Sequence, residues 1–521
     1  MPTGNVGMFV TMCCYMAIVI GIGLYFAKRS NKNSENYFIG GRTLGPWVAA
    51  MSAEASDMSG WLLMGLPGVA YWFGLSDAVW TAIGLLIGTY LNWLIVAKRL
   101  YSYSIIADNS ITIPDFFSNR FKEKNKIIMT IAAIFILVFF TVYASSCFVT
   151  VGKLFHSLFG IPYLYLMIGG AIFVVFYTFL GGFLAESTSD FMQGIVMILA
   201  LGMVLITGLV YAGGPAAVID NLKQIPGFLD FFGIASPTVT DGVQQVSAGG
   251  APLFGAAGKY GLLTIVSTMS WGLGYFGVPQ VLLRFMAIRR QDEIKKSRRI
   301  ATTWCGISLF AAVCIGLVGR AIFPADLLTA SSAESVFITM ASSLLPTVLA
   351  GLAMAGILAA TISSSDSYLL ISASAFSKNI FQGLIKKNAT DKQVMLVTRI
   401  VLLAVTLIGI LIALDENSVI FKVVSFAWAG FGATFGPIML FSLFWKRTTR
   451  QGAIAGMLSG GVAVFIWRLI IKPFGGVFGI YELLPAFIVS CVFIVLVSLM
   501  TKKPSEEIQR DFDAAKVYKD A

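Results

Sequence analysis

Stretches of about 20 predominantly apolar residues recur from one end of this sequence to the other, and each is long enough to cross a hydrocarbon core of about 30 Å. The chain has 521 residues, of which 57% are hydrophobic and only 12% are charged. Soluble domains carry about 25% charged residues, so this composition leaves no room for one. The sequence therefore predicts an all-α polytopic membrane protein whose function lies within the bilayer.

Thirteen spanning helices are expected, and basic residues gather in alternate connections between them. The expected spans are 7–27, 44–72, 76–97, 126–154, 162–181, 189–212, 258–288, 299–323, 335–378, 391–414, 418–444, 452–474 and 481–500. The basic connections are 28–42, 120–126, 288–299, the stretch around Lys386 and Lys387, 445–450 and the tail from Lys502. By the positive-inside rule these connections are cytoplasmic, which places the N-terminus outside and the C-terminus inside. The net charge of +11 thus reflects membrane topology rather than nucleic-acid binding.

Several classes of function are excluded by residues that the sequence lacks. Its only histidine is His156, so neither a Ser-His-Asp triad nor a multi-histidine metal site can form. It contains no GxxxxGK[ST] phosphate-binding loop. The six cysteines have no CxxC spacing and are expected to be free thiols in apolar helices. These features argue against an enzyme and against ATP hydrolysis within this chain, and nothing in the sequence indicates an obligatory protein partner.

Two apolar segments are longer than a crossing requires, and they resemble each other. Residues 56–68 read SDMSGWLLMGLPG, and residues 267–280 read STMSWGLGYFGVPQ. Both contain Ser-x-Met-Ser followed by tryptophan, glycine and proline, and four expected helices lie between them. A second copy that crosses in the opposite direction is typical of an inverted repeat of five plus five helices whose first helices are broken. A chance match between Gly- and Ser-rich helices is the alternative.

The repeat divides the chain into five regions. They are an extra N-terminal helix with a cytoplasmic loop (1–43), the first repeat with its outer loop (44–257), the second repeat (258–444), two C-terminal helices (445–500) and a cytoplasmic tail (501–521).

Broken helices provide ion-binding groups in the middle of a membrane. Because proline lacks an N–H and glycine admits unusual dihedral angles, both segments, which contain Pro67 and Pro279, should unwind near mid-membrane. The freed carbonyls suit Na⁺, and the N-termini of half-helices suit a carboxylate. Asp57 should face a cation in the protein interior, because a carboxylate at the membrane centre costs about 2.5–3.5 kcal/mol. Alternatively, Asp57 caps a half-helix or pairs with Arg42. Glu54 lies one turn nearer the cytoplasm, in wetter surroundings, and is given no role.

A third segment supplies hydroxyl groups. Ala360, Ser363, Ser364 and Ser367 lie on one helix face at positions i, i+3, i+4 and i+7. Two hydroxyls and the Ala360 carbonyl can join two freed carbonyls in a shell of about five oxygens, which suits a hard cation. The alternative is close packing of helices through small residues.

At these residues the sequence resembles the sodium:solute symporter family, and within it the bacterial members that carry proline. The matching stretches cover nearly the whole chain in order: GGRTLGPWVAAMSAEASDMSGWLLMGLPG, FFTVYASS, WGLGYFGVPQVLLRFMA, ILAATISSSDS, SFAWAGFGATFGP and RTTRQGAIAGMLSG. The last one matches the family's basic-x4-Gly-Ala signature at Arg447, Gly452 and Ala453. The resemblance implies a LeuT-type five-plus-five core in a bacterial cytoplasmic membrane, with one helix before the core and two after it.

The resemblance also implies which residues act. A Na⁺ site would use the carbonyls of Ala55, Met58 and Ala360 and the hydroxyls of Ser363 and Ser364, with Asp57 and Arg42 supporting Na⁺ binding or coupling. The substrate positions are Ser59, Gly60, Trp61, Tyr143, Trp271, Tyr275 and Pro279. Asp190 matches an aspartate that several relatives share.

Three residues depart from the family pattern, and two of them add carboxyl groups. They are Glu54 where glycine is expected, Ser364 where threonine is expected and Asp366 where a neutral residue is expected. Because two nearby carboxylates cannot both ionise cheaply, Asp366 with Asp190 and Ser367 can form a second cation site for Na⁺ or H⁺. The alternative is that Asp366 points into cytoplasmic water.

The expected function is Na⁺-coupled symport of L-proline into the cell by alternating access, within surrounding membrane lipid. Trp61, Tyr143, Trp271 and Tyr275 would form apolar walls for the pyrrolidine ring and attract its ammonium, unless they serve only for packing. One alternative is the same mechanism with another small solute, such as pantothenate or a sugar. A channel or a sensor is the other alternative.

Overall fold

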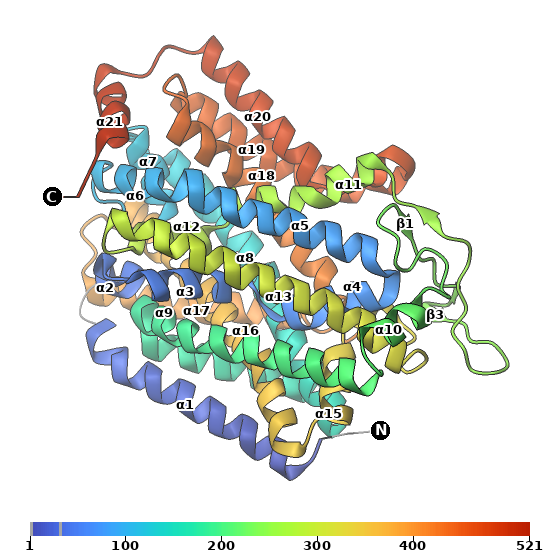
Figure 1. Ribbon diagram of the computed structural model, residues 1–521. Helices are drawn as coiled ribbons and strands as arrows, with labels where there is room; N and C mark the ends of the chain where they lie inside the picture. Colours follow the sequence, from blue (N-terminus) through green and yellow to red (C-terminus); the bar gives the residue numbers. More distant parts are fainter. Residues whose placement is uncertain (1–3, 31–33, 521) are drawn as a thin grey trace.

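The computed structural model describes residues 4–30 and 34–520 and is predominantly helical. Nine helices in these residues are long and apolar enough to cross a membrane, and four shorter apolar helices occur beside them. Each of these helices falls on one of the thirteen expected spans. The long helices run side by side in a single bundle, with the start of α1 (Val6–Ser30) and α21 (Glu506–Val517) at opposite ends (Figure 1). Residues 1–3, 31–33 and 521 lie outside the described residues. The first two ranges belong to the predicted region 1–43, residues 31–33 also belong to the predicted basic connection 28–42, and residue 521 belongs to the predicted tail.

The helices and strands follow one another along the chain with few long connections. The helical elements are α1, α2 (Ser34–Ile39), η1 (Gly40–Arg42), α3 (Pro46–Asp57), η2 (Trp61–Gly65), α4 (Leu66–Phe73), α5 (Leu75–Leu91), η3 (Asn92–Val96), α6 (Ala97–Ile106), α7 (Ile113–Arg120), α8 (Ile127–Phe159), α9 (Tyr163–Tyr211), α10 (Pro215–Leu222), α11 (Leu262–Met269), η4 (Ser270–Phe276), α12 (Pro279–Ala287), η5 (Gln291–Glu293), α13 (Ile294–Ile322), α14 (Ala330–Ala333), α15 (Val336–Leu344), α16 (Thr347–Ser374), η6 (Ala375–Ile385), α17 (Asp391–Ile412), α18 (Ile420–Phe444), α19 (Arg450–Ile466), η7 (Trp467–Ile471), η8 (Lys472–Phe474), η9 (Gly476–Gly479), α20 (Leu483–Met500) and α21. Two antiparallel strand pairs, β1 (Gly233–Ile234) with β4 (Gly258–Lys259) and β2 (Val239–Thr240) with β3 (Val243–Gln244), lie in the connection from α10 to α11.

The first broken helix is interrupted before its proline, not at it. Helix α3 ends at Asp57, and Met58 leaves the helical region with φ −81° and ψ 73°. The chain then enters the wide turn η2 and continues into α4, where Pro67 lies in the first turn. Gly65 and Leu66 keep helical angles and the Leu66 N–H bonds to the Trp61 carbonyl, so η2 and α4 form one continuous helix and Pro67 does not cause the break. The break that the sequence predicted in this helix thus lies at Met58.

The break predicted in the second of these helices lies between α11 and α12. Helix α11 ends at Met269, the tighter turn η4 follows, and Pro279 begins α12. A proline at this position fits the start of a helix because its fixed φ is already helical. The unwound turn also packs closely on α5, since a Cβ placed on Gly88 would lie only 2.3 Å from the Gly272 carbonyl oxygen.

Two other expected spans differ in detail from the structure. The expected span 335–378 is divided, because Leu345 and Pro346 adopt extended backbone between α15 and α16. A residue before proline disfavours the helical region, which explains the interruption. Helix α9 covers the fifth and sixth expected spans and is kinked at Gly182, whose φ of 63° is accessible to glycine.

The predicted cytoplasmic tail contains the helix α21, which packs on the bundle. Phe512 is 1% exposed, and the Arg120 guanidinium lies 5.3 Å from the centre of its ring. Lys446 Nζ lies 2.5 Å from an Asp513 carboxyl oxygen, and this hydrogen bond lowers the pKa of Asp513. The tail is thus attached to the same end of the bundle as α6 and α7 (Figure 1).

Candidate functional site

Four of the five predicted Na⁺-ligand residues meet where α3 faces α16. Ser363 Oγ donates hydrogen bonds to the carbonyl oxygens of Ala55 (2.8 Å) and Ala360 (3.2 Å), and Ser364 Oγ lies 3.3 Å from the Ala55 oxygen. The Ser59 N–H, which would continue the helix at Ala55, bonds to the Asp57 carbonyl instead. The break therefore leaves the Ala55 carbonyl to the two serines. Hydroxyl protons can rotate, so these oxygens can turn their lone pairs toward a cation.

The fifth residue of the predicted shell, Met58, lies at the break itself. Its backbone leaves the helical region, and its N–H still bonds to the Glu54 carbonyl at 2.8 Å. The break thus begins immediately after the last helical hydrogen bond of α3. All five residues are fully buried.

Asp57 is fully buried beside this break and is bonded to neutral donors. Tyr275 Oη donates to its carboxylate at 2.8 Å, and Gln280 Nε2 lies 3.5 Å from the other carboxylate oxygen. The Trp61 indole and the Tyr143 hydroxyl donate to its backbone carbonyl, at 3.3 and 3.4 Å. These bonds tie the break in α3 to η4, the unwound turn of the other broken helix.

Arg42 lies at the opposite end of α3 from Asp57. Its guanidinium donates to Ser104, Asn109 and the carbonyls of Ser110 and Met286. The twelve residues of α3 extend for about 18 Å at 1.5 Å per residue. Arg42, which precedes α3, and Asp57, which ends it, are therefore separated by the length of this helix. Arg42 thus ties the start of α3 to α6, to the connection that follows it and to α12.

Glu54 is buried, contrary to the wetter position expected for it. It is 1% exposed, and its Oε2 atom has no hydrogen-bond partner within residues 4–30 and 34–520. The expectation failed because α3 is covered along its length by α9, α12 and α13.

Six of the seven predicted substrate positions surround the two breaks. The Trp61 and Trp271 rings lie 6.1 Å apart, and Tyr275 contacts Trp428 edge to face at 5.1 Å. Tyr143 stacks on Tyr368, with ring centres 4.2 Å apart. Ser59 Oγ is buried and has no hydrogen-bond partner in the part of the chain that the structure describes, and a Cβ on Gly60 would meet Thr150 at 2.4 Å. Pro279 instead lines a separate small cavity with Phe38 and Thr112.

A cavity of about 540 Å³ opens above this aromatic group, at the predicted outer end of the bundle. Trp271 lies in its lining, together with Phe421 and Tyr481, and stacks on Tyr481 with ring centres 5.2 Å apart. Of the predicted substrate residues only Trp271 lines this cavity. Trp271 thus contacts both the outer cavity and Trp61, which does not line it.

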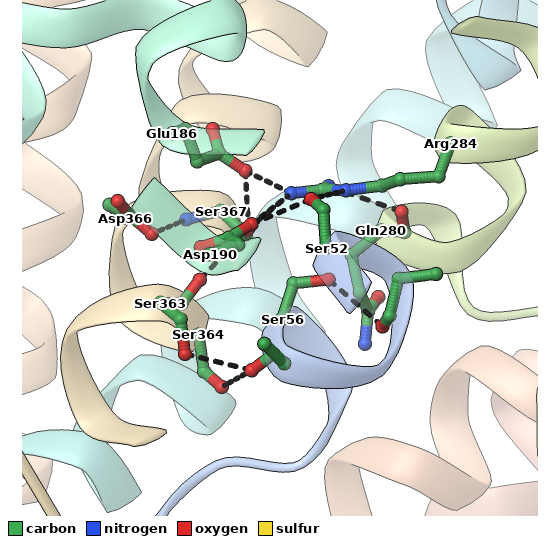
Figure 2. A network of polar contacts seen from close by, with 12 residues as sticks. Ser52, Ser56, Glu186, Asp190, Gln280, Arg284, Ser363, Ser364, Asp366 and Ser367 are labelled. Carbon is green, nitrogen blue, oxygen red and sulfur yellow. Dashed lines mark hydrogen bonds and ion pairs between the residues drawn. The ribbon is translucent and has the colours of Figure 1, made fainter. Parts of the chain in front are cut away.

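A second polar group, centred on Arg284, joins four helices (Figure 2). The Arg284 guanidinium bonds to Glu186, to Asp190 at 3.2 Å, to Ser367 at 2.9 Å and to Ser52 at 3.0 Å. Ser52 also donates to Asp190 at 2.7 Å. Arg284 thus occupies the space between Asp190 and Ser367, two of the three residues expected to form a second cation site.

Asp366, the third of them, is 2% exposed, so the alternative that it points into water is wrong. Its Oδ1 atom accepts the Ser367 N–H at 2.8 Å, and helices α8 and α9 cover this part of α16. Among the described residues, no group of three or more His, Cys, Asp or Glu side chains could hold one metal ion.

Sequence reasoning missed Arg284 and Glu186. Arg284 lies inside an expected span, where an arginine requires a buried anion as partner. This requirement was the feature of the sequence that could have identified Arg284 as part of a buried ionic group. Glu186 falls between two expected spans and was assigned to a connection, whereas α9 continues through it as helix.

Known proteins resemble this chain over nearly all of its length. The profile of the Sodium:solute symporter family matches residues 37–460. The Sodium/proline symporters of Staphylococcus aureus strains USA300 and NCTC 8325 are 39% identical over 511 residues, which cover 97% of this chain and 95% of each relative. These relatives are transporters and not enzymes.

Solved structures identify the fold. A Na⁺-coupled sialic acid symporter in a substrate-bound outward-open state superimposes with a TM-score of 0.76 at 18% identity, over 96% of this chain and 99% of that one. Mhp1, a nucleobase-cation-symport-1 family transporter, gives 0.50 at 14% identity, over 93% and 100%. MhsT in complex with L-phenylalanine also gives 0.50 at 14% identity, over 87% and 97%. The expected LeuT-type fold class is confirmed, while the number of membrane crossings stays a prediction.

Proposed function

Because the chain belongs to the sodium:solute symporter family, we propose that it couples inward movement of Na⁺ to uptake of L-proline across a bacterial cytoplasmic membrane. The observation that carries this proposal is the meeting of the Ala55 and Ala360 carbonyls with the Ser363 and Ser364 hydroxyls at the break in α3. Neutral oxygens at a broken helix suit Na⁺, and the Met58 carbonyl would complete the shell. The N-terminus would lie outside and the C-terminus inside.

Proline is proposed as the solute because of the relatives and the chemistry near the breaks. The 39% identical relatives carry the name Sodium/proline symporter. Trp61, Tyr143, Trp271 and Tyr275 would enclose the pyrrolidine ring, and their ring faces attract an ammonium. The Ser59 hydroxyl, which bonds to no other group among the described residues, can donate to the carboxylate of the amino acid.

Asp57 would couple the two ligands in this proposal. Its carboxylate is bonded to Tyr275 of the substrate group, and it belongs to the same helical turn as Ala55 of the cation shell. A cation at Ala55 would therefore stabilise the Asp57 charge and the orientation of Tyr275 together. Arg42 would support coupling from the far end of α3, where it bonds to α12 through the Met286 carbonyl.

One Na⁺ per proline is sufficient to drive uptake. One charge that crosses about 150 mV releases roughly 3.5 kcal/mol, and a tenfold Na⁺ gradient adds about 1.4 kcal/mol. Together these terms support accumulation of roughly three orders of magnitude.

Competition for labelled proline uptake tests the identity of the solute. Unlabelled proline is expected to suppress uptake into proteoliposomes, whereas pantothenate, betaines and sugars at equal concentration leave it unchanged. Stronger suppression by one of those compounds would assign the site to that compound instead of proline.

The Trp271→Ala variant is expected to raise the proline concentration for half-maximal uptake by about tenfold or more, a loss of about 1.4 kcal/mol. Trp271 would lose contact with the ring of the solute, while the oxygen shell at Ala55 would keep its geometry. Na⁺-induced change of tryptophan fluorescence should therefore persist. Trp80→Ala is the matched control, because Trp80 packs on Phe231 of the outer connection. Equal proline affinity in Trp271→Ala and the parent would place the solute elsewhere.

A further inference from the structure

The chain returns to the bundle after its last expected span, and its final helix is fixed there by a buried aromatic side chain. Phe512 of α21 is 1% exposed, and its ring centre lies 6.2 Å from that of Tyr103 on α6. The guanidinium groups of Arg99 on α6 and Arg120 on α7 each lie 5.3 Å from the same ring centre. A cation over an aromatic ring adds attraction to the apolar contact. Figure 1 shows α21 and the end of the chain beside α6 and α7, at the end of the bundle that we call the inner end.

Residues 518–520, which follow α21, reach the connection between the broken helix α12 and α13. The backbone N–H of Gln291 donates to one oxygen of the Asp520 carboxylate at 2.5 Å, and the Gln291 side-chain amide donates to the Tyr518 carbonyl at 3.2 Å. The Tyr101 hydroxyl on α6 donates to the other Asp520 oxygen at 3.0 Å. Gln291 begins η5, shortly after α12 ends at Ala287. The end of the chain thus ties the inner end of α12 to α6.

Ion pairs whose side chains are partly exposed add to this attachment. Lys122, which follows α7, lies 3.0 Å from Asp511 and 3.7 Å from Glu507. Lys446, in the connection from α18 to α19, lies 2.5 Å from Asp513. These side chains are between 26% and 60% exposed. Pairs between exposed charges weaken as salt screens them, so ionic strength can loosen this part of the attachment.

The helices beside this attachment close the way from the substrate group to the inner end. The cavity between α7, α12 and α16 has a volume of only about 10 Å³, enough for about one water molecule. Its lining includes Pro114 of α7, Pro279 and Leu283 of α12, and Ile371 and Ser374 of α16. The cavity at the predicted outer end measures about 540 Å³. A solute as large as proline therefore passes to the inner end only after the walls of the small cavity separate.

We propose that residues 506–520, which we call the C-terminal strap, hold the inner end closed, and that inward release of the solute requires this strap to loosen. The strap connects two walls of the small cavity, because α21 is fixed to α7 and the residues after it are bonded to the connection that follows α12. The proposal rests on the proposed function only in the inward direction of transport.

The strap acts on helices that Arg42 also joins. The Arg42 guanidinium donates to Ser104 on α6 and to the Met286 carbonyl on α12, at 3.0 and 2.6 Å. Tyr101, which binds Asp520, lies less than one turn from Ser104 on the same helix. Loosening the strap weakens the attachment of α12 while the Arg42 bonds remain. The expected effect is therefore a shift between closed and open states rather than loss of the fold.

Alkylation of a cysteine in the small cavity tests the proposal on the purified full-length protein, without proline. Ser374→Cys provides the reporter, because Ser374 lines the cavity and is only 6% exposed. Labelling by N-ethylmaleimide is followed by mass spectrometry of the peptide that contains the reporter. Adding Phe512→Ala should raise the labelling rate by about tenfold or more, because it removes the buried anchor of the strap. Val517→Ala is the matched control and should leave the rate unchanged, since Val517 is 77% exposed on the same helix.

Asp520→Asn provides a second variant, which keeps the buried anchor. It removes the charge that accepts the Gln291 N–H and the Tyr101 hydroxyl, so the labelling rate of the reporter should rise severalfold. Raising choline chloride from about 50 to about 500 mM should increase the rate in the parent as well, because salt screens the exposed ion pairs.

Cys305 serves as the internal control in the same samples, because it is fully buried on α13. Its labelling should stay slow in every variant, since opening of the inner end leaves the rest of the bundle packed. A reporter rate that neither Phe512→Ala nor Asp520→Asn changes would overturn the proposal. A parallel rise at Cys305 would overturn it too, because it would reveal a general loss of packing. Since no proline is present, failure of proline uptake leaves these rates unchanged, and the two proposals can fail separately.

Discussion

Replacement of Arg284 by glutamine is expected to destabilise the folded protein by about 3–5 kcal/mol, because it leaves a buried group of carboxylates without its cation. Arg284 is fully buried and bonds to Glu186, Asp190 and Ser367. Glutamine can replace part of the hydrogen bonding but none of the charge. Thermal unfolding of the purified protein in detergent, followed by the loss of monodisperse protein, measures the effect.

The double variant Arg284→Gln/Glu186→Gln provides the internal test of this explanation. Removing one carboxylate together with the cation should restore part of the lost stability, which is the coupling expected of residues in one charged network. Arg289→Gln is the matched control, because the Arg289 side chain is 54% exposed in its pair with Glu293 and exposed pairs of this kind contribute little to stability. If Arg284→Gln unfolded at the same temperature as Arg289→Gln, Arg284 would not hold the four helices together.

The Asp57→Asn variant is expected to raise the Na⁺ concentration for half-maximal uptake by about ten- to a hundredfold, a loss of about 1.4–2.7 kcal/mol. Asparagine keeps an oxygen that can accept the Tyr275 hydroxyl, so the packing of the break is retained and only the charge is lost. A carboxylate near a buried cation contributes this much even when it does not bind the ion directly. Proline recognition at saturating Na⁺ should change little.

Uptake measured over a series of Na⁺ concentrations checks this expectation. Asp415→Asn is the control, because Asp415 lies exposed in the connection from α17 to α18. An unchanged Na⁺ dependence in Asp57→Asn would remove Asp57 from the coupling mechanism and leave it as part of the packing around Tyr275.

The parts of the site that the sequence predicted are those that local patterns encode. The spacing of Ala360, Ser363 and Ser364 places them on one helix face, and the two Ser-x-Met-Ser segments mark the broken helices. The two serines meet Ala55 because α16 packs against α3.

Other parts depend on contacts between distant residues, which no local pattern encodes. Glu186 and Arg284 are 98 positions apart, and their pairing exists only because α9 and α12 approach each other around α3. Asp366 was assigned to water or to Asp190, whereas its burial depends on α8 and α9, which cover α16. The break in the first of these helices was predicted, but Pro67 does not mark its position, because the wide turn η2 accommodates that proline within a continuous helix.

The central claim is that Na⁺ bound at the break in α3 drives the entry of proline. The most direct measurement is the accumulation of labelled proline in proteoliposomes that contain the purified protein and carry an imposed inward Na⁺ gradient. We predict that internal proline rises more than tenfold above the external concentration, and that a Na⁺ ionophore abolishes the rise. Proline that only equilibrates across the membrane, together with a Na⁺ current that flows without proline, would contradict the account and indicate a channel.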